Sequence, residues 1–230
     1  MRLAIFDIDG TLVQGSSERM FWRFLLARRR QGLRQLAAYA LFMIRYVPVG
    51  GIHTVKRNKA YLSGLDTGEI AELAEEFVRT RLLRELHAPA VERLNRHVAR
   101  GDKVMLMSGT LQPIARSLAR HLGAAEAWAT LANERGGRYT ANPPETHPFD
   151  VGKLVLAREL ARSAGADLAQ AAAYGDSRHD LPLLRAVGEP VAVRPDAKLL
   201  EVAERLGWEV LPDAGRSPLP FSKAEESRFL

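Results

Sequence analysis

Cysteine is absent from this sequence of 230 residues, which excludes disulfide bonds, thiolate nucleophiles and cysteine-ligated zinc or iron–sulfur sites. Long apolar runs are also absent, because no stretch reaches the roughly 18 residues typical of a transmembrane helix. The first carboxylate comes at Asp7, so the N-terminus does not fit a secretory signal peptide. Hydrophobic residues make up 47% and charged residues 26%, as in globular proteins. We therefore expect a folded, cytoplasmic protein.

Acidic residues are scarce in one segment of the chain. Residues 14–60 contain ten basic residues and a single acidic one, Glu18, whereas the chain outside residues 14–86 is balanced in charge. Such a basic segment indicates an anionic partner, which is a substrate, a lipid surface or nucleic acid. A solvated arginine-rich helix face is the alternative interpretation. Trp22 has mostly aliphatic neighbours, so base stacking is not favoured and no nucleic-acid partner is expected.

Apolar runs alternate with helical patterns from residue 87 onward. Residues 103–107, for example, form a short apolar run that ends at Ser108, as in a buried strand, and a helical pattern follows. This alternation predicts an α/β, Rossmann-like core with a parallel sheet. The expected strands are 2–8, 103–107, 127–132, 170–175, 190–194 and 208–211, and the expected helices are 89–100, 112–122, 151–164, 180–187 and 196–206, with a hairpin at 136–137.

Residues 14–86 contain only helical patterns and are interpreted as an insertion into this core. Helices are expected over 18–47, with a break near 30–32, over 53–62, and from Asp66 to about residue 86. Asp66 can cap the last of these helices, with Glu69 three residues on, as in a capping box. The expected domains are the core, residues 1–13 and 87–211, the helical insertion, residues 14–86, and an extended C-terminal tail, residues 212–230.

Two carboxylates follow the first expected strand. Asp7 and Asp9 are two residues apart, so their side chains can reach a common point beyond the strand end. Ligands of parallel α/β sheets bind at this edge. Two acids followed by Gly10 could bind a metal and act on an electrophile, although an Asp-x-Asp sequence can also simply begin a turn.

Three further groups of polar residues have the same placement. Ser108 and Gly109 lie where a strand meets a helix, which suits an anion cradle but also an ordinary helix cap. Lys153 lies one turn into a helix, where the helix dipole disfavours a cation unless an anion is near. Asp176 and Asp180 follow another strand and could supply a metal ligand and a supporting carboxylate.

The four groups together resemble the motifs of the haloacid-dehalogenase superfamily of phosphohydrolases. The matching residues are Asp7-x-Asp9-Gly10-Thr11, Ser108, Lys153 and Gly175-Asp176-x-x-x-Asp180. The insertion between the first two motifs has the position of an all-helical type-1 cap in that family. Stretches such as residues 137–140, 174–177, 180–184, 207–211 and 56–62 are similar to the phosphoserine-phosphatase-like subfamily, called IB.

This resemblance implies hydrolysis of a phosphomonoester through an aspartyl-phosphate. In that scheme Asp7 is the nucleophile and Asp9 the general acid and base. Mg²⁺ is the implied cofactor, held by Asp7, the Asp9 backbone carbonyl and Asp176, with Asp180 orienting the metal's water shell. Ser108, the Gly109 amide and Lys153 are the implied phosphate ligands.

The chain departs from the nearest family pattern at two positions. Phosphoserine phosphatases carry a glutamate that meets the substrate amine, where this chain has Ser16, with Glu18 two residues later. They also carry Asn before the last motif aspartate, where this chain has His179. Phosphoserine is therefore an unexpected substrate. Ser16, Lys56, Arg57 and His179 are candidates for setting specificity, and Lys59 belongs to the same subfamily-like stretch.

Residues 36–44 are apolar on all sides and have arginines on both flanks. We expect this segment to be buried within the insertion or in a dimer contact, because helices that are apolar all round are usually buried. The alternative is a helix at an anionic membrane surface. The expected substrate is a small soluble phosphorylated metabolite, and the alternative is a lipid phosphate such as phosphatidylglycerophosphate, handled by a membrane-peripheral enzyme. A basic adaptor with a vestigial site is disfavoured because all four motifs are intact.

Overall fold

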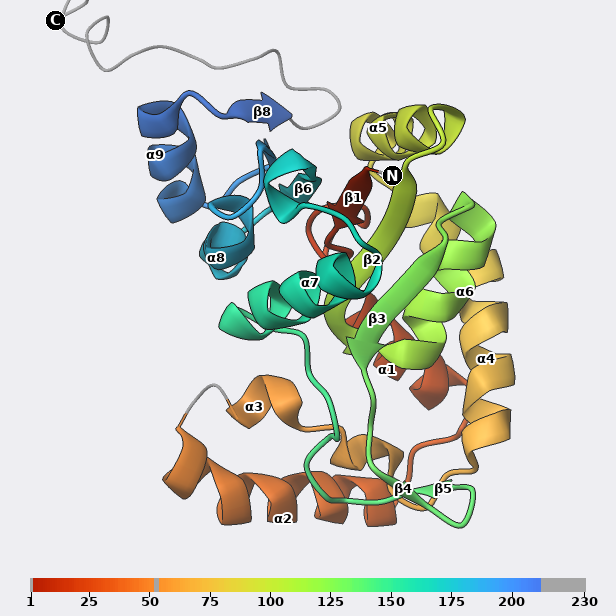
Figure 1. The fold of residues 1–230 in the computed structure, drawn as a ribbon. Coiled ribbons are helices and arrows are strands. Elements are labelled where there is room, and N and C mark those ends of the chain that lie inside the picture. The colour runs from red at the N-terminus through yellow and green to blue at the C-terminus, as the bar shows by residue number, and fades with distance from the viewer. Residues whose placement is uncertain (1, 52–53, 212–230) are drawn as a thin grey trace, which may run out of the picture.

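A parallel β-sheet forms the centre of the computed structural model, which describes residues 2–51 and 54–211 (Figure 1). The strand order is β3-β2-β1-β6-β7-β8, and each neighbouring pair is parallel. The strands are β1 (Leu3–Phe6), β2 (Lys103–Leu111), β3 (Glu126–Thr130), β6 (Ala172–Gly175), β7 (Glu189–Val193) and β8 (Glu209–Leu211), with β4 (Glu134–Arg135) and β5 (Arg138–Tyr139) in a separate hairpin. The predicted α/β Rossmann-like core is confirmed, and the tail from residue 212 lies outside the described residues.

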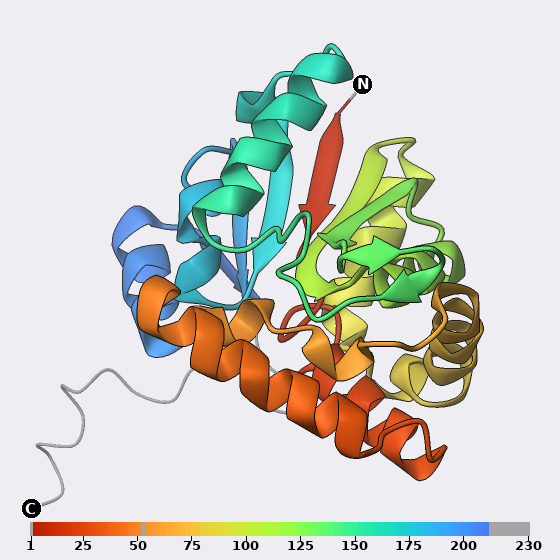
Figure 2. The ribbon, with the colours of Figure 1, turned by 90° about the horizontal axis from the view of Figure 1, so that it is seen from below.

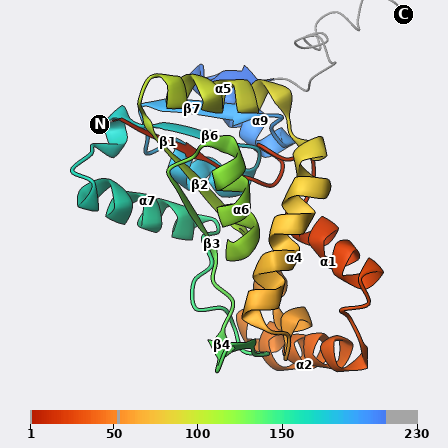
Figure 3. The same cartoon turned by 90° about the vertical axis from the view of Figure 1, so that its right-hand side faces the viewer.

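Helices cover both faces of this sheet. The longer helices are α1 (Ser17–Ala27), α2 (Leu33–Gly50), α4 (Thr67–Thr80), α5 (Ala88–Ala99), α6 (Gln112–Leu122), α7 (Val151–Ser163) and α9 (Ala197–Leu206). The shorter ones are α3 (Thr54–Arg57), α8 (Leu181–Leu184), η1 (Ala60–Leu62), η2 (Leu82–Glu85), η3 (Leu168–Gln170) and η4 (Arg178–Asp180). Figure 3 shows α5 and α6 on one side of the sheet and α7 on the other.

Alternating side chains of the strands fill the two cores. Phe6 stacks on Tyr174 at 4.0 Å between ring centroids, and both belong to the core beneath α5 and α6. The preceding Ile5 faces the opposite core, together with Ala173 and Leu199. This alternation is the period-two pattern of a strand buried on both faces. Because β1 and β6 are parallel neighbours, their carboxyl ends lie at the same edge of the sheet, where the polar motifs lie.

The helical insertion lies beyond that edge. In Figure 2, α2 crosses in front of the ends of the strands, with α1 and α3 between it and the core. Ser16 caps α1 by accepting a hydrogen bond from the Arg19 amide at 3.3 Å, and Asp66 caps α4 at Gly68 and Glu69. The break predicted near 30–32 is present between α1 and α2.

Two predicted helices of the insertion are shorter than expected. The helix over 53–62 is interrupted at Asn58, whose side chain accepts a hydrogen bond from the Ala60 amide at 3.0 Å and so replaces a helical bond. The helix from Asp66 ends at Thr80 and is followed by η2. The expected helix over 180–187 is likewise only α8, with η4 before it.

Helix α2 corrects the expectation that residues 36–44 are buried within the insertion, whereas their burial in a dimer contact stays a prediction. Phe42 is its one buried residue, whereas Leu36, Leu41 and Ile44 are 65%, 61% and 72% exposed. Helix α2 is the outermost helix of the insertion, so it has neighbours on one side and solvent on the other (Figure 1). No helix among the described residues is long and apolar enough to cross a membrane.

Hydrogen bonds attach the insertion to the core, in addition to the two points where the chain passes from one to the other. Two amides of the insertion donate hydrogen bonds to the hairpin β4–β5: Gly64 to Tyr139 O at 2.8 Å and Thr67 to Gly137 O at 2.9 Å. In the other direction, the Tyr139 amide donates to Leu65 O. Figure 3 shows α4 lying along α6. The start of α4 is thereby held by a hairpin of the core.

Candidate active site

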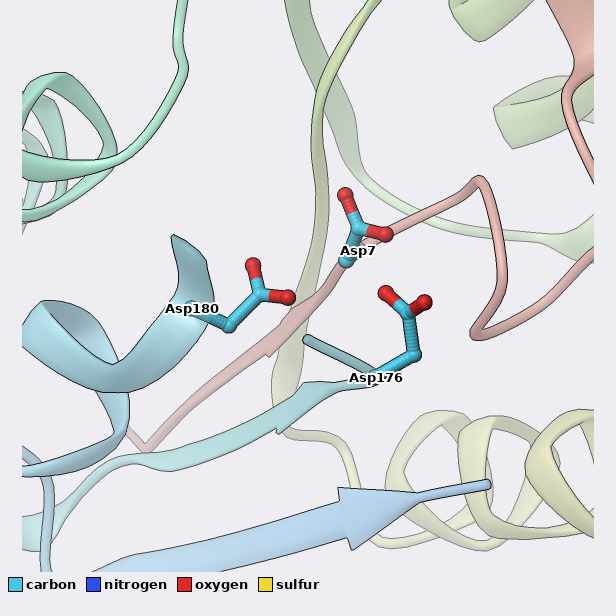
Figure 4. Close-up of side chains that lie close together, drawn as sticks. All are labelled: Asp7, Asp176 and Asp180. Carbon is cyan, nitrogen blue, oxygen red and sulfur yellow. The ribbon is translucent and has the colours of Figure 1, made fainter. Parts of the chain in front are cut away.

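Three carboxylates meet at the ends of β1 and β6. Asp7 directly follows β1, Asp176 follows β6, and Asp180 ends η4. One oxygen from each lies within 4.8 Å of the others, and Figure 4 shows the three groups turned toward one another. The sequence-based expectation that these acids gather at one edge of the sheet agrees with this arrangement.

Lys153 is the cation of this cluster. Its Nζ donates to Asp7 Oδ1 at 2.5 Å and to Asp180 Oδ1 at 2.6 Å, and all three side chains are buried. Helix α7 positions it, because the lysine lies in the first turn of a helix that begins beside the carboxylates. The two carboxylates offset the cost of burial and raise the pKa of Lys153, so it remains charged.

One lysine does not balance three clustered carboxylates, of which Asp7 and Asp180 are buried and Asp176 is half-buried. Burial raises the pKa of Asp7 well above its ordinary value, and the charges of Asp180 and Asp176 raise it further against the effect of Lys153. Burial and the charge of Asp180 raise the pKa of Asp176 to about 7. Such mutual repulsion is relieved by a divalent cation, and an all-oxygen donor set suits a hard one.

Asp9 is half-buried and lies beside the first turn of α1. Its Oδ1 accepts a hydrogen bond from the Ser17 amide at 2.9 Å. Burial raises the pKa of Asp9, against the effect of its hydrogen bonds to Ser17. This environment favours the protonated form, which a proton donor needs.

Two glycines allow the carboxylates to approach so closely. Gly10 has φ +88°, and a Cβ on it would lie 2.0 Å from Asp176 Oδ2. A Cβ on Gly175 would lie 2.5 Å from the Cβ of Asp180. Larger residues at either position would push an aspartate out of the cluster.

The structure corrects the prediction that Ser108 and Gly109 lie where a strand meets a helix, because β2 continues to Leu111 and both residues lie within it. Ser108 is buried, and its Oγ accepts the Thr110 amide at 3.2 Å. The Thr110 hydroxyl is 2.7 Å from the Ser17 hydroxyl, which joins β2 to α1. Ser108, Gly109 and Lys153 line one pocket of about 1250 Å³, together with the carboxylates.

Three of the four specificity candidates also line this pocket. They are Ser16, Lys56 and His179, whereas Arg57 is not among its lining residues in the described part of the chain. Lys56 Nζ lies 4.2 Å from the ring centroid of Phe149, and burial lowers its pKa. His179 Nδ1 lies 2.9 Å from Asp150 Oδ2.

The sequence did not reveal two polar networks at the pocket. Lys59 is buried and forms an ion pair with Glu18, whose other oxygen accepts the Tyr61 hydroxyl at 2.9 Å. Thr130 donates to Gly109 O at 2.6 Å and lies 2.7 Å from His147 Nδ1. The partners are far apart in sequence, so local patterns carried no signal for either network.

We predict that Lys153→Met destabilises the metal-free protein near neutral pH by about 3–5 kcal/mol, because two buried carboxylates lose their cation. The loss should shrink as the pH falls and the carboxylates take up protons. Urea unfolding at two pH values measures it. Lys103→Met is the matched control, since its pair with Glu126 is partly exposed and is worth about 0–1 kcal/mol. Equal losses in the two variants would contradict the prediction.

Comparison with known proteins gives the same family as the motifs. The sequence model of the haloacid dehalogenase-like hydrolase family matches residues 4–185 of this chain. A putative hydrolase of Mycobacterium leprae is 31% identical and covers 90% of this chain and 71% of the relative. A Mycobacterium tuberculosis phosphoserine phosphatase is 32% identical, over 90% of this chain and 69% of the relative. A Neisseria meningitidis histidinol-phosphatase is 30% identical, over 91% of this chain and 97% of the relative.

Solved structures agree with the fold. A Bordetella pertussis protein of unknown function superposes with a TM-score of 0.77 at 32% identity, over 91% of this chain and 97% of that one. A substrate-bound phosphoserine phosphatase has a TM-score of 0.62 at 17% identity, over 91% and 92%, which shows a shared fold. With its motifs at the strand ends and a family match over most of its length, the chain belongs to the haloacid dehalogenase-like hydrolase family, as an enzyme of the phosphatase type.

Proposed function

We propose that the protein hydrolyses a phosphomonoester through a covalent aspartyl-phosphate on Asp7, with Mg²⁺ as cofactor, as a member of subfamily IB. The observation that carries this proposal is the cluster of Asp7, Asp176 and Asp180 around Lys153. It combines an ionisable nucleophile, a cation for the phosphoryl oxygens and ligands for a metal. These are the parts that phosphoryl transfer requires.

In the first step an oxygen of Asp7 attacks phosphorus and the phosphorus–oxygen bond to the leaving group breaks. Lys153 favours the ionised form of Asp7, as the attack requires. Burial raises the pKa of Asp9, which favours its protonated form, and in this scheme Asp9 donates its proton to the leaving oxygen. Asp9 then accepts a proton from the water that attacks the aspartyl-phosphate. The products are the alcohol and inorganic phosphate, and Asp7 is regenerated.

The donor set fits Mg²⁺. Asp7, the Asp9 backbone carbonyl and Asp176 would hold the ion, and Asp180 would orient its waters, since Mg²⁺ prefers oxygen ligands and retains waters. The bound ion would stabilise negative charge on the phosphoryl oxygens. Ser108, the Gly109 amide and Lys153 would bind the remaining phosphoryl oxygens. A phosphate-release screen over soluble and lipid phosphomonoesters, with and without Mg²⁺, tests the whole scheme, and no release from any ester would overturn it.

The substrate is a phosphomonoester other than phosphoserine. The related proteins bear the names of phosphoserine and histidinol phosphatases, and both substrates carry an amine. In this chain Ser16 replaces the amine-contacting glutamate, and the nearby Glu18 is already paired with Lys59 and Tyr61. A buried ammonium without a partner is costly. Exposed apolar residues on α2 keep a lipid phosphate as the second candidate.

We predict that phosphoserine is hydrolysed at least about tenfold less efficiently than the best substrate, because its ammonium group has no free carboxylate to pair with. A comparison of kcat/KM values measures the difference. Lys59→Gln provides the reverse test: it frees Glu18, so the rate for phosphoserine relative to p-nitrophenyl phosphate should rise. Phosphoserine as the best wild-type substrate would contradict the prediction and would assign Glu18 to the amine.

A further inference from the structure

The pocket extends far beyond the carboxylates, along the insertion. Its volume of about 1250 Å³ exceeds what a small polar phosphate fills. We use the name helical arm for the part lined by α1 and α2. The residues of the helical arm are Ser16, Glu18, Arg19, Trp22, Arg23 and Leu26 from α1 with its cap, and Gly32, Leu33, Gln35, Leu36 and Tyr39 from α2 with its cap.

The helical arm leads away from the reacting groups. Helix α1 starts at the site, where the Ser17 amide donates to Asp9. Each helical residue advances by 1.5 Å, so Leu26 lies about 13 Å further along the axis than Ser17. The lining residues of α1 recur every three or four positions, which places them on one face of the helix.

The walls of the helical arm are apolar and solvent-accessible. Trp22 and Leu26 on α1 are 41% and 42% exposed, and Leu33 and Leu36 on α2 are 85% and 65% exposed. Single exposed apolar residues are ordinary, whereas a group along a groove is typical of a binding site. The surface therefore suits an apolar ligand group.

The amide side chains along the same walls are already committed to the protein. Gln31 Nε2 donates to Tyr61 O at 3.2 Å, and Gln35 Nε2 donates to Ser63 O at 3.1 Å. Asn58 donates to Tyr39 O and accepts from the Ala60 amide. A sugar or a nucleobase would need free amide groups here for recognition, because its own polar groups lose affinity when they are buried without a partner. An aliphatic chain needs none.

We propose that the substrate carries a long unbranched aliphatic chain, which lies in the helical arm while its phosphate monoester reaches Asp7. This inference rests on the proposed function and names its substrate class. Arg19 and Arg23 also line the arm, on the same face of α1 as Trp22 and Leu26, and their aliphatic stems can pack along such a chain while their charged ends stay in water. Such a chain can reach the enzyme as a free monomer or from a bilayer.

Purified enzyme with Mg²⁺ and a series of ethyl, butyl, hexyl, octyl and decyl phosphates, kept below their micelle concentrations, tests the proposal. We expect kcat/KM to rise about two- to fourfold for each methylene that the arm buries, up to a plateau at its end. Hydrolysis of the series with no dependence on chain length would overturn the inference and leave the proposed function standing. No hydrolysis of any ester would overturn the proposed function itself.

Two paired variants locate the chain. The double variant Leu26→Ser, Leu36→Ser should lower the decyl-to-ethyl ratio of kcat/KM at least about fivefold, because it makes both walls polar. Leu41→Ser, Ile44→Ser is the matched control: both residues are exposed on α2 outside the pocket and should leave the ratio unchanged. An unchanged ratio in the first variant would overturn the assignment to the helical arm.

A second assay with vesicles distinguishes a bilayer from free monomers as the source of the aliphatic substrate. Decyl phosphate is presented in phosphatidylglycerol vesicles to wild type and to Leu41→Ser, Ile44→Ser. A slower rate in this variant on vesicles alone supports a bilayer source, and equal rates support the free monomer. Both outcomes support an aliphatic substrate, since the monomeric series decides that point.

Discussion

Asp7→Asn should lower kcat for p-nitrophenyl phosphate by at least about 10³-fold, because the amide cannot form the covalent intermediate. Asn has nearly the same shape and can still accept a hydrogen bond from Lys153, so the fold should persist. Removing one of the three clustered carboxylates should even raise the thermal midpoint of the metal-free protein. Steady-state kinetics and thermal unfolding of the same samples measure both effects.

Acid-quenched protein offers an independent check on the nucleophile. Mass spectrometry should find one phosphoryl group on the peptide containing Asp7 in wild type, more of it in Asp9→Asn, and none in Asp7→Asn. Asp167→Asn is the control, because Asp167 is an exposed cap of η3, at the other end of β6. Retention of more than a few per cent of wild-type turnover by Asp7→Asn would remove Asp7 as the nucleophile.

Chelation of divalent cations should abolish turnover, with residual activity below about 1%, because Lys153 alone does not offset the carboxylate cluster. Mg²⁺ should restore activity. Ca²⁺ should inhibit it, since Ca²⁺ takes a larger coordination number. Full activity in excess chelator would contradict the proposed metal site.

The same cluster should make the stabilisation by Mg²⁺ depend on pH. The pKa of Asp176 is about 7 in the folded protein, above its ordinary value of 3.8, so the folded state holds a proton that the unfolded state releases. The metal-free protein should therefore lose stability as the pH rises from about 4 to about 7. Mg²⁺ replaces the proton, and its effect on the thermal midpoint should be larger near pH 8 than near pH 5. Equal effects at both pH values would contradict this linkage.

The core of the fold and its polar motifs could be predicted because both depend on local patterns. An apolar run that ends at Asp7 defines β1 and its carboxyl end, and parallel strands bring such ends together. The run over 103–107 locates β2, although this strand continues past Ser108 to Leu111. The break between α1 and α2 was similarly visible in the sequence. The interruption at Asn58 was not, because one side-chain hydrogen bond decides it.

The position of α2 and the inner lining of the pocket could not be predicted. An apolar segment such as residues 36–44 indicates burial, but burial on all sides needs elements on both sides of the helix, and α2 is the outermost helix of the insertion. Glu18 was visible as the one acid of a basic segment. Its pairing with Lys59 and Tyr61 depends on tertiary contacts across more than forty residues of sequence.

The hairpin contacts of the insertion have a consequence for how a substrate gains access to Asp7. A swing of the whole insertion about its two chain crossings would break the bonds that join Gly64 and Thr67 to the hairpin β4–β5, and would separate α4 from α6. Helix α2 is bonded within the insertion, where Gln35 donates to Ser63 O and Tyr39 O accepts from Asn58, and it faces solvent on one side. We therefore expect the mouth of the pocket to open by local displacement of α2, with α4 stationary, so that amide hydrogens of α2 exchange with solvent well before those of α4.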